Sequence, residues 1–256
     1  MSNFKHEVKN RIRENGENVA FQKAANHFMM ESGGPMYTYN FSYLGRPIIQ
    51  YPQDMVAVQE LIWGIKPDLI IEMGIAHGGS LIMSASMLAL LDICEAINEG
   101  ITLDPAQSKR KVLGVDIDIR DHNKKALNDH PMRSRIQMIE GSSIAPEVIK
   151  EVHNVAKGYE KIMVCLDSNH THDHVLAELD AYSSLTTLGS YCIVFDTLIE
   201  DMPSTMFNNR EWGPGDNPKT AVWEFLKSHP EFEIDKNIQN KLLITVAPDG
   251  FLKRIS

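Results

Sequence analysis

Residues 69–80 read LIIEMGIAHGGS, a short apolar run that ends in an acid and a turn with three glycines. The run Leu69–Met73 is typical of a buried strand, and the glycines break it into a turn. Glycines allow a backbone to approach a ligand closely, and the helix expected from Ser80 to about Glu99 would offer free N–H groups at its start. The stretch therefore predicts the opening strand, turn and helix of a doubly wound α/β fold.

Strand and helix signals alternate along the rest of the chain. Four more strands are expected at 112–116, 136–140, 161–167 and 190–196, with helices at 121–129, 146–156, 172–184 and 219–229. Segments around 232–234 and 242–246 are expected to close the sheet. Such βαβ units predict a mainly parallel sheet with helices on both faces, in the strand order 3-2-1-4-5.

The first 53 residues differ from this pattern. Residues 1–30 scatter apolar side chains among charges and are expected to be helical, whereas residues 31–53 hold glycine–proline breaks and aromatic side chains. We expect the second stretch to be irregular, with a strand or a lid, and a new helix to begin at the N-cap Asp54. The predicted organisation is an N-terminal helical and irregular extension, 1–53, followed by a catalytic α/β domain, 54–256.

Composition narrows the class of protein. The chain has 256 residues and a formal net charge of −9 at pH 7, without a dense cluster of Lys and Arg, which argues against a nucleic-acid partner. It has no apolar run of about 18 residues and no signal-peptide core, so no membrane span is expected. Cys94, Cys165 and Cys192 form no CxxC pair, so reduced thiols and a cytoplasmic location are expected.

The spacing of the glycines indicates the ligand. G-x-x-x-G-G differs from the G-x-G-x-x-G of dinucleotide-binding turns, and the lysine of a P-loop is absent. An acid two residues before the first glycine, with a second acid ending the next strand, is instead the pattern of class I methyltransferases, which bind S-adenosylmethionine. Glu72 is expected to face the cationic end of this cofactor and Asp116 to hold its ribose hydroxyls. The other expected contacts are Gly74, His77, Gly78, Gly79, Ser80 and Ser142. In the alternative, the glycines only make a tight turn.

Two aspartates end neighbouring strands of the predicted sheet. Asp167 closes the fourth strand and Asp196 the fifth, and neighbouring strands lie about 4.8 Å apart, so the two carboxylates can share one ion. Carboxylate oxygens favour Mg²⁺ or Mn²⁺, beside which a substrate hydroxyl can lose its proton. His170 is the expected general base, because imidazole titrates near neutral pH. In the alternative, the aspartates cap helices and His170 is structural.

Several separated motifs occur in order along the chain. They are EMGIAHGGS at 72–80, GVDIDIR at 114–120, DSNH at 167–170, WGPG at 212–215 and PDGFLKR at 248–254. Together they resemble the cephalosporin hydroxylase family over roughly residues 43–256. Despite its name, that family has the S-adenosylmethionine methyltransferase fold and is similar to the Mg²⁺-dependent sugar O-methyltransferases of macrolide and aminocoumarin pathways. The resemblance implies this fold and cofactor, metal ligands at Asp167 and Asp196, and a base at His170.

One position departs from the family pattern. The family usually carries Glu-Asp at the end of the fifth strand, whereas this chain has Phe195 before Asp196. One expected metal ligand is therefore missing. Two outcomes are open: Glu200 or Asp201, a few residues further along the chain, takes its place, or the metal binds weakly.

The resemblance implies an S-adenosylmethionine-dependent O-methyltransferase that acts on a hydroxyl of a sugar, a glycan or a glycosylated metabolite. We also expect the chain to form a homo-oligomer. Two alternatives stay open. One is a non-catalytic, cofactor-binding partner of another enzyme, and the other is a hydroxylase in which His170, His172 and Asp167 bind iron.

Overall fold

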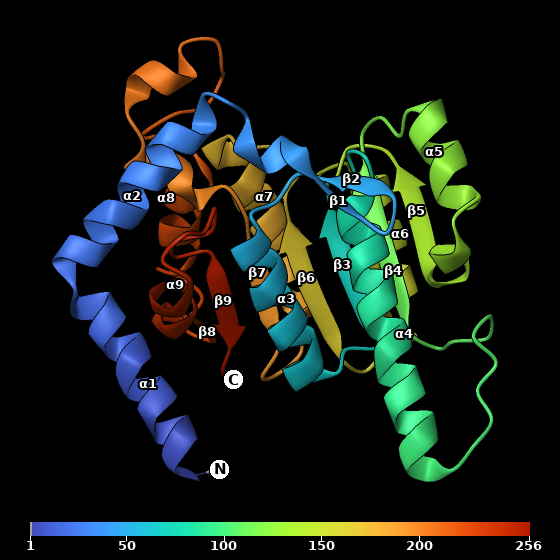
Figure 1. Cartoon of the computed structure of the whole chain (residues 1–256). Coiled ribbons are helices and arrows are strands. Elements are labelled where there is room, and N and C mark those ends of the chain that lie inside the picture. Colours follow the sequence, from blue (N-terminus) through green and yellow to red (C-terminus); the bar gives the residue numbers. More distant parts are fainter. Residues whose placement is uncertain (1) are drawn as a thin grey trace.

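A single seven-stranded sheet forms the centre of the molecule (Figure 1). The computed structural model describes residues 2–256. Along the sheet the strands follow the order β5-β4-β3-β6-β7-β9-β8. Their bounds are β3 (Leu69–Met73), β4 (Lys111–Asp116), β5 (Ile136–Glu140), β6 (Ile162–Leu166), β7 (Tyr191–Val194), β8 (Phe232–Ile234) and β9 (Phe251–Arg254).

The five strands from β5 to β7 are mutually parallel, and β9 runs antiparallel to both of its neighbours. The predicted order 3-2-1-4-5 and the mainly parallel, doubly wound sheet are therefore confirmed. The segment expected at 232–234 forms the edge strand β8, whereas the expectation of a strand at 242–246 is wrong, and β9 pairs with β7 instead. The 242–246 segment turns inward, where Thr245 Oγ1 and Val246 N donate hydrogen bonds to the buried carboxylate of Asp54.

Helices cover both faces of the sheet, because successive side chains of the central strands point to opposite sides. Ile70 packs into one apolar cluster with α3 and α4, while Leu69 and Ile71 pack into the other with α6, α7 and α8. The helices are α3 (Pro52–Ile65), α4 (Gly79–Glu99), α5 (Asp121–Asn128), α6 (Pro146–Ala156), α7 (His172–Tyr182), α8 (Pro218–Phe225) and α9 (Lys236–Leu242). Short 3₁₀ turns lie at Pro131–Arg135, Ser183–Leu185, Thr197–Asp201 and Ser204–Phe207.

The long helix α4 follows the glycine turn directly and contains a long apolar stretch. Its length and composition would allow it to cross a membrane, but half of its apolar window is buried inside the molecule. It lies along the sheet in Figure 1 beside α3. The helix therefore has the burial of a core element.

The N-terminal extension climbs one side of the molecule and then crosses the carboxyl end of the sheet (Figure 1). It consists of α1 (Ser2–Glu17), α2 (Val19–Gly33), a 3₁₀ turn (Tyr37–Asn40) and the hairpin of β1 (Phe41–Tyr43) with β2 (Arg46–Ile48). Edge-on contacts join the rings of Phe28, Tyr37 and Phe41. Tyr37 and Phe41 also pack against the core cluster that contains residues of α3 and α4, and they thus hold the extension over the site described below.

Helix α3 begins at Pro52, two residues before the predicted N-cap. Proline suits the first turn of a helix because its missing N–H would have no partner there. Tyr51 occupies the cap position, and Asp54 lies inside the first turn with none of its surface exposed. Burial raises the pKa of Asp54 to about 7. The expectation that Asp54 caps the helix is wrong, because its carboxylate instead accepts hydrogen bonds from Thr245 and Val246.

Candidate active site

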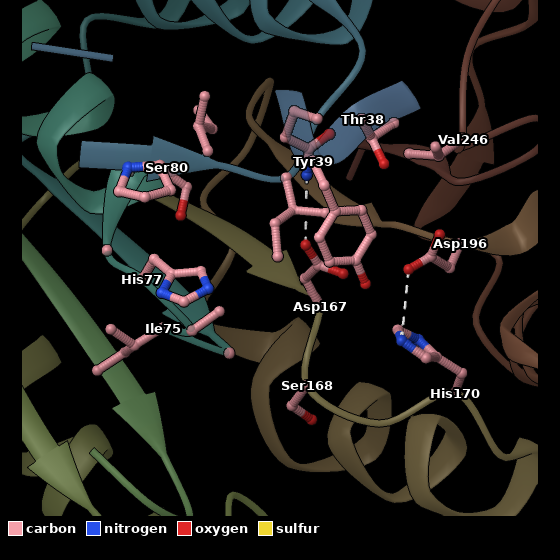
Figure 2. Close-up of a pocket in the computed structure, with 18 residues that line it drawn as sticks. Thr38, Tyr39, Ile75, His77, Ser80, Asp167, Ser168, His170, Asp196 and Val246 are labelled. Carbon is pink, nitrogen blue, oxygen red and sulfur yellow. Dashed lines mark hydrogen bonds and ion pairs between the residues drawn. The ribbon is translucent and has the colours of Figure 1, made fainter. Parts of the chain in front are cut away.

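A cavity of about 330 Å³ opens at the carboxyl ends of β3, β6 and β7. One wall is the glycine turn from Gly74 to Ser80, and a second is made by Asp167, His170 and Asp196. The extension supplies the third wall (Figure 2). The cavity thus lies where ligands bind in doubly wound folds, at the point where the chain leaves β3 in one direction and β6 in the other.

The three glycines of the turn are required by close packing within the protein. Gly74 has φ of +98°, and a Cβ there would overlap the carbonyl oxygen of Asp167. A Cβ at Gly78, where φ is +80°, would meet the side chain of Leu127, and one at Gly79 would overlap the carbonyl oxygen of Pro47. The backbone of the turn lines the cavity, while the missing side chains make room for neighbouring elements.

His77 takes part in the same turn through its backbone. Its carbonyl oxygen accepts hydrogen bonds from Nε and a terminal nitrogen of Arg46, at 3.0 and 2.7 Å. The Arg46 guanidinium also donates to Asn123 Oδ1 at 2.7 Å. Because Arg46 belongs to β2, these bonds tie the extension to the glycine turn.

Glu72 lies beneath the turn, on the last residue but one of β3, and is 5% exposed. Ser80 Oγ, from the first turn of α4, donates a hydrogen bond to it. Burial raises the pKa of Glu72 to about 7, although the Ser80 bond opposes the shift. A buried acid with one donor and no cationic partner is well placed to receive a positively charged ligand group.

Asp116 and Ser142 line a second, smaller cavity of about 100 Å³ together with His174. The two cavities share Gly74 and Ser168 in their walls. Each carboxylate oxygen of Asp116 accepts backbone hydrogen bonds: Oδ2 from the N–H groups of residues 75 and 76, and Oδ1 from that of residue 118. Asp116 therefore shapes the glycine turn as well as facing the second cavity.

The structure brings Asp167, His170 and Asp196 together. One ligand atom from each residue lies within 4.8 Å of the others. His170 Nε2 is 3.4 Å from Asp196 Oδ2, a pair marked in Figure 2. Burial, followed by the negative charge of Asp196, raises the pKa of Asp167 well above its ordinary value. Among the described residues 2–256 no Lys or Arg pairs with the two carboxylates, and the cluster therefore has the charge and the oxygen donors of a divalent-metal site.

The structure does not supply the missing ligand from any of the three positions near the end of β7. Phe195 is 6% exposed and packs into the core cluster that contains α3 and α4. Glu200 accepts hydrogen bonds from Gly215 N and Asn217 Nδ2, so it holds the loop after β7 instead. Asp201 pairs with the ammonium group of a lysine in α8, at 2.6 Å. The expectation that Glu200 or Asp201 serves as the ligand is therefore wrong.

Among the extension residues that line the cavity, Gln50 and Tyr39 had no role assigned from the sequence. Gln50 Nε2 donates a hydrogen bond to Asp167 Oδ2 at 3.3 Å, across 117 positions of the chain. Tyr39 lines the cavity and keeps 52% of its surface exposed. A third neighbour, Trp212, contacts the ring of His170 edge-on at a centroid distance of 4.9 Å. Of the three, only Trp212 belongs to a recognisable motif, WGPG.

Comparison with known sequences places this arrangement in a family. The family described as Rhamnosyl O-methyltransferase/CmcI matches residues 35–255. The chain belongs to this family. Membership confirms the resemblance to the cephalosporin hydroxylase family and the assignment as a methyltransferase. The match begins inside the extension, two residues before the turn that contains Tyr39.

Two mycobacterial relatives are both named rhamnosyl O-methyltransferase. The rhamnosyl O-methyltransferase of Mycobacterium tuberculosis (strain ATCC 25618 / H37Rv) is 29% identical over 216 residues, which are 83% of this chain and 78% of that protein. The rhamnosyl O-methyltransferase of Mycobacterium leprae (strain TN) is 28% identical over 215 residues, 83% of this chain and 82% of that protein. Each alignment spans most of both chains.

Solved structures share the fold. The structure titled "CmcI-N160 apo-structure" superposes with a TM-score of 0.51 at 17% identity, covering 85% of this chain and 77% of that one. The structure titled "cmcI-D160 Mg-SAM" gives a TM-score of 0.51 at 16% identity, covering 85% and 78%. The expected Rossmann-like methyltransferase fold is confirmed.

Proposed function

We propose that this protein transfers a methyl group from S-adenosylmethionine to a hydroxyl group of a sugar, with a divalent cation at the site. The observation that carries the proposal is the meeting of Asp167, His170 and Asp196 beside the glycine turn in one cavity. Family membership supports the methyl transfer. The mycobacterial relatives are named rhamnosyl O-methyltransferases, which supports a sugar, such as a rhamnosyl group, as the acceptor.

The two adjoining cavities fit the cofactor, which supplies the methyl group when it is bound. The smaller cavity offers Asp116 and Ser142 to the nucleoside, and the larger one offers the backbone from Gly74 to Ser80. Glu72 lines the small space next to Asp167 instead of either cavity, and a cationic group nearby would favour its charged form. Asp116 Oδ1 accepts one backbone hydrogen bond and can therefore accept a ribose hydroxyl as well.

The cluster fits a hard cation, because two carboxylates converge there in a confined space. Asp167 and Asp196 would hold Mg²⁺ or Mn²⁺, and a cation at this place would make a nearby acceptor hydroxyl more acidic. The raised pKa of Asp167 supports this fit, because two neighbouring carboxylates without a cation repel each other.

His170 is placed to remove the proton of the acceptor hydroxyl. Its imidazole lines the cavity, and the edge of Trp212 restrains the ring. The hydroxyl oxygen would bond to the methyl carbon as the carbon–sulfur bond of the sulfonium breaks, leaving a neutral thioether, and Nε2 would accept the hydroxyl proton. Positioned bases contribute about 10²- to 10⁴-fold to such steps.

The extension supplies the wall for the acceptor. Thr38 and Tyr39 line the cavity together with Val246. An exposed tyrosine ring beside a hydroxyl-methylating site suits the apolar C–H face of a sugar, while hydroxyl groups remain free for polar contacts. We therefore assign residues 1–53 as an extension that completes the acceptor pocket of the domain 54–256.

Two further proposals concern the state of the protein in the cell. Cys165 and Cys192 are free and buried, which supports a reducing, cytoplasmic location. Trp63 on α3 and Ile97 on α4 are 54% and 74% exposed, which supports a homo-oligomer that covers these side chains. Analytical ultracentrifugation of the full chain tests the second proposal.

Binding and transfer can be tested separately. Titration calorimetry with S-adenosylhomocysteine should show micromolar affinity, and Asp116→Ala should weaken it at least tenfold. Asp118→Ala is the matched control, since its side chain is 71% exposed and should leave the affinity unchanged. Transfer of labelled methyl groups from S-adenosylmethionine to a panel of rhamnosides and other glycosides then tests the reaction. Tight binding of a dinucleotide without S-adenosylhomocysteine binding would overturn the proposal.

A further inference from the structure

Gln50 lies in the link between β2 and α3 and is only 8% exposed. Its side chain lines the active-site cavity and also a smaller buried space behind it, next to Asp167 and Phe195. One end of its amide, Nε2, donates to Asp167 Oδ2. The other end, Oε1, is buried and has no hydrogen-bond partner within the part of the chain that the structure describes, residues 2–256. Buried polar atoms are nearly always paired, so this oxygen requires an explanation.

The amide group can present either end to the cluster. Its oxygen and nitrogen are alike in size, and a half-turn about the last side-chain bond exchanges their positions. When the carboxylates carry no ion, the N–H end faces Asp167, as the structure shows. When a cation lies among the carboxylates, the N–H end is repelled and the carbonyl oxygen becomes the favourable partner.

The donor set of the cluster leaves room for such an oxygen. Asp167 and Asp196 offer carboxylate oxygens and His170 serves as the base, whereas Mg²⁺ takes six ligands, part of which are waters. Phe195 turns into the apolar core and contributes no donor. An amide carbonyl is among the oxygen ligands that hard cations accept.

We propose that Gln50 is a ligand of the divalent cation, through Oε1, and that the N-terminal extension thereby completes the metal site. This inference rests on the proposed function, because it requires a cation at Asp167 and Asp196. It assigns the extension a second task beside shaping the acceptor pocket. Gln50 would bind the cation, and it does not line the smaller cavity that contains Asp116 and Ser142.

Binding of Mn²⁺ alone, followed by electron paramagnetic resonance, tests the assignment without any substrate. Gln50→Met keeps the length of the side chain but removes both polar ends, and it should weaken Mn²⁺ binding about tenfold. Gln50→Glu restores an oxygen and should recover the affinity. The matched control is Gln53→Met: Gln53 Oε1 is also buried and unpaired, yet in the described residues 2–256 it lines neither space that contains Gln50.

Equal Mn²⁺ affinity in Gln50→Met and the parent protein would overturn the inference, as would a parent protein that takes up no Mn²⁺. Equal losses in Gln50→Met and Gln53→Met would also overturn it, because they would reflect general damage. Calorimetry with S-adenosylhomocysteine on the same samples reports whether the proposed cofactor site survives independently. If Gln50→Met does not fold, Gln50→Glu and Gln50→Asn take its place. Mn²⁺ affinity that is retained in Gln50→Glu and reduced in Gln50→Asn supports the ligand role. Any other pattern of Mn²⁺ affinities opposes it.

Discussion

Replacing Asp167 by asparagine should raise the stability of the metal-free protein while abolishing its affinity for Mn²⁺. The carboxylate of Asp167 faces that of Asp196 and is partly buried, so its charge is unfavourable when no cation is present. Asparagine has nearly the same shape and can still accept the hydrogen bond from Gln50 Nε2. The change therefore removes a repulsion and keeps the packing.

The size of the gain follows from the geometry. Two unit charges 4.8 Å apart repel by about 3.5 kcal/mol at an effective dielectric constant of about 20. The side chain of Asp196 is 35% exposed, so water screens the interaction and about 1 to 2 kcal/mol remains. For a chain of this length, that amounts to an increase in Tm of about 3 to 6 °C.

The pH dependence has a definite sign. The pKa of Asp167 is raised in the folded state above the ordinary value of 3.8. The contribution of the Asp167 side chain to stability is thus fully present below about pH 4 and is lost as the pH rises through its folded-state pKa. The advantage of Asp167→Asn should therefore be large at pH 8 and disappear in acid.

Thermal unfolding in EDTA and in Mn²⁺, at pH 8 and pH 5, measures both effects. The parent protein should gain about 2.7 kcal/mol when Mn²⁺ is present at one hundred times its Kd, whereas Asp167→Asn should gain nothing. Asp173→Asn, which removes an acid from the first turn of α7, is the control for loss of a negative charge. A lower Tm of Asp167→Asn in EDTA would refute the reasoning, because it would show that the carboxylate is a structural hydrogen-bonding group.

Three further outcomes are expected. His170→Ala should lower the rate of methyl transfer about 10²- to 10⁴-fold in a radiometric assay, at unchanged cofactor affinity. The ring of His172 bonds to Thr220 instead, so His172→Ala should change that rate little. Gly74→Ala should cost about 3 kcal/mol in urea unfolding, because its φ of +98° and the nearby carbonyl oxygen disfavour a Cβ. Burial raises the folded-state pKa of Asp54 to about 7, so its contribution to stability is lost as the pH rises from about 4 through 7. Asp54→Asn should therefore flatten the fall in unfolding free energy over that range, and an unchanged slope would contradict this.

The fold could be predicted because its signals are local. Short apolar runs alternate with helical stretches, and a glycine turn follows the first strand of the sheet. Parallel strands bring their carboxyl ends to one edge, so the meeting of Asp167 and Asp196 follows from the strand order alone. Where a tertiary contact replaced a local rule, the prediction failed: Asp54 is a buried acceptor and not a helix cap, and the segment bonded to it does not form a strand.

The sequence by itself determined the doubly wound sheet, the glycine turn and the acids at the strand ends, because each depends on spacing within a single strand–helix unit. The tertiary structure alone decided which extension residues reach the site. Gln50 contacts Asp167 across 117 positions, and Phe195 turns into the core although its neighbour Asp196 faces the cavity. No periodicity encodes such contacts, because they arise only when the extension packs across the carboxyl end of the sheet and buries its aromatic side chains there.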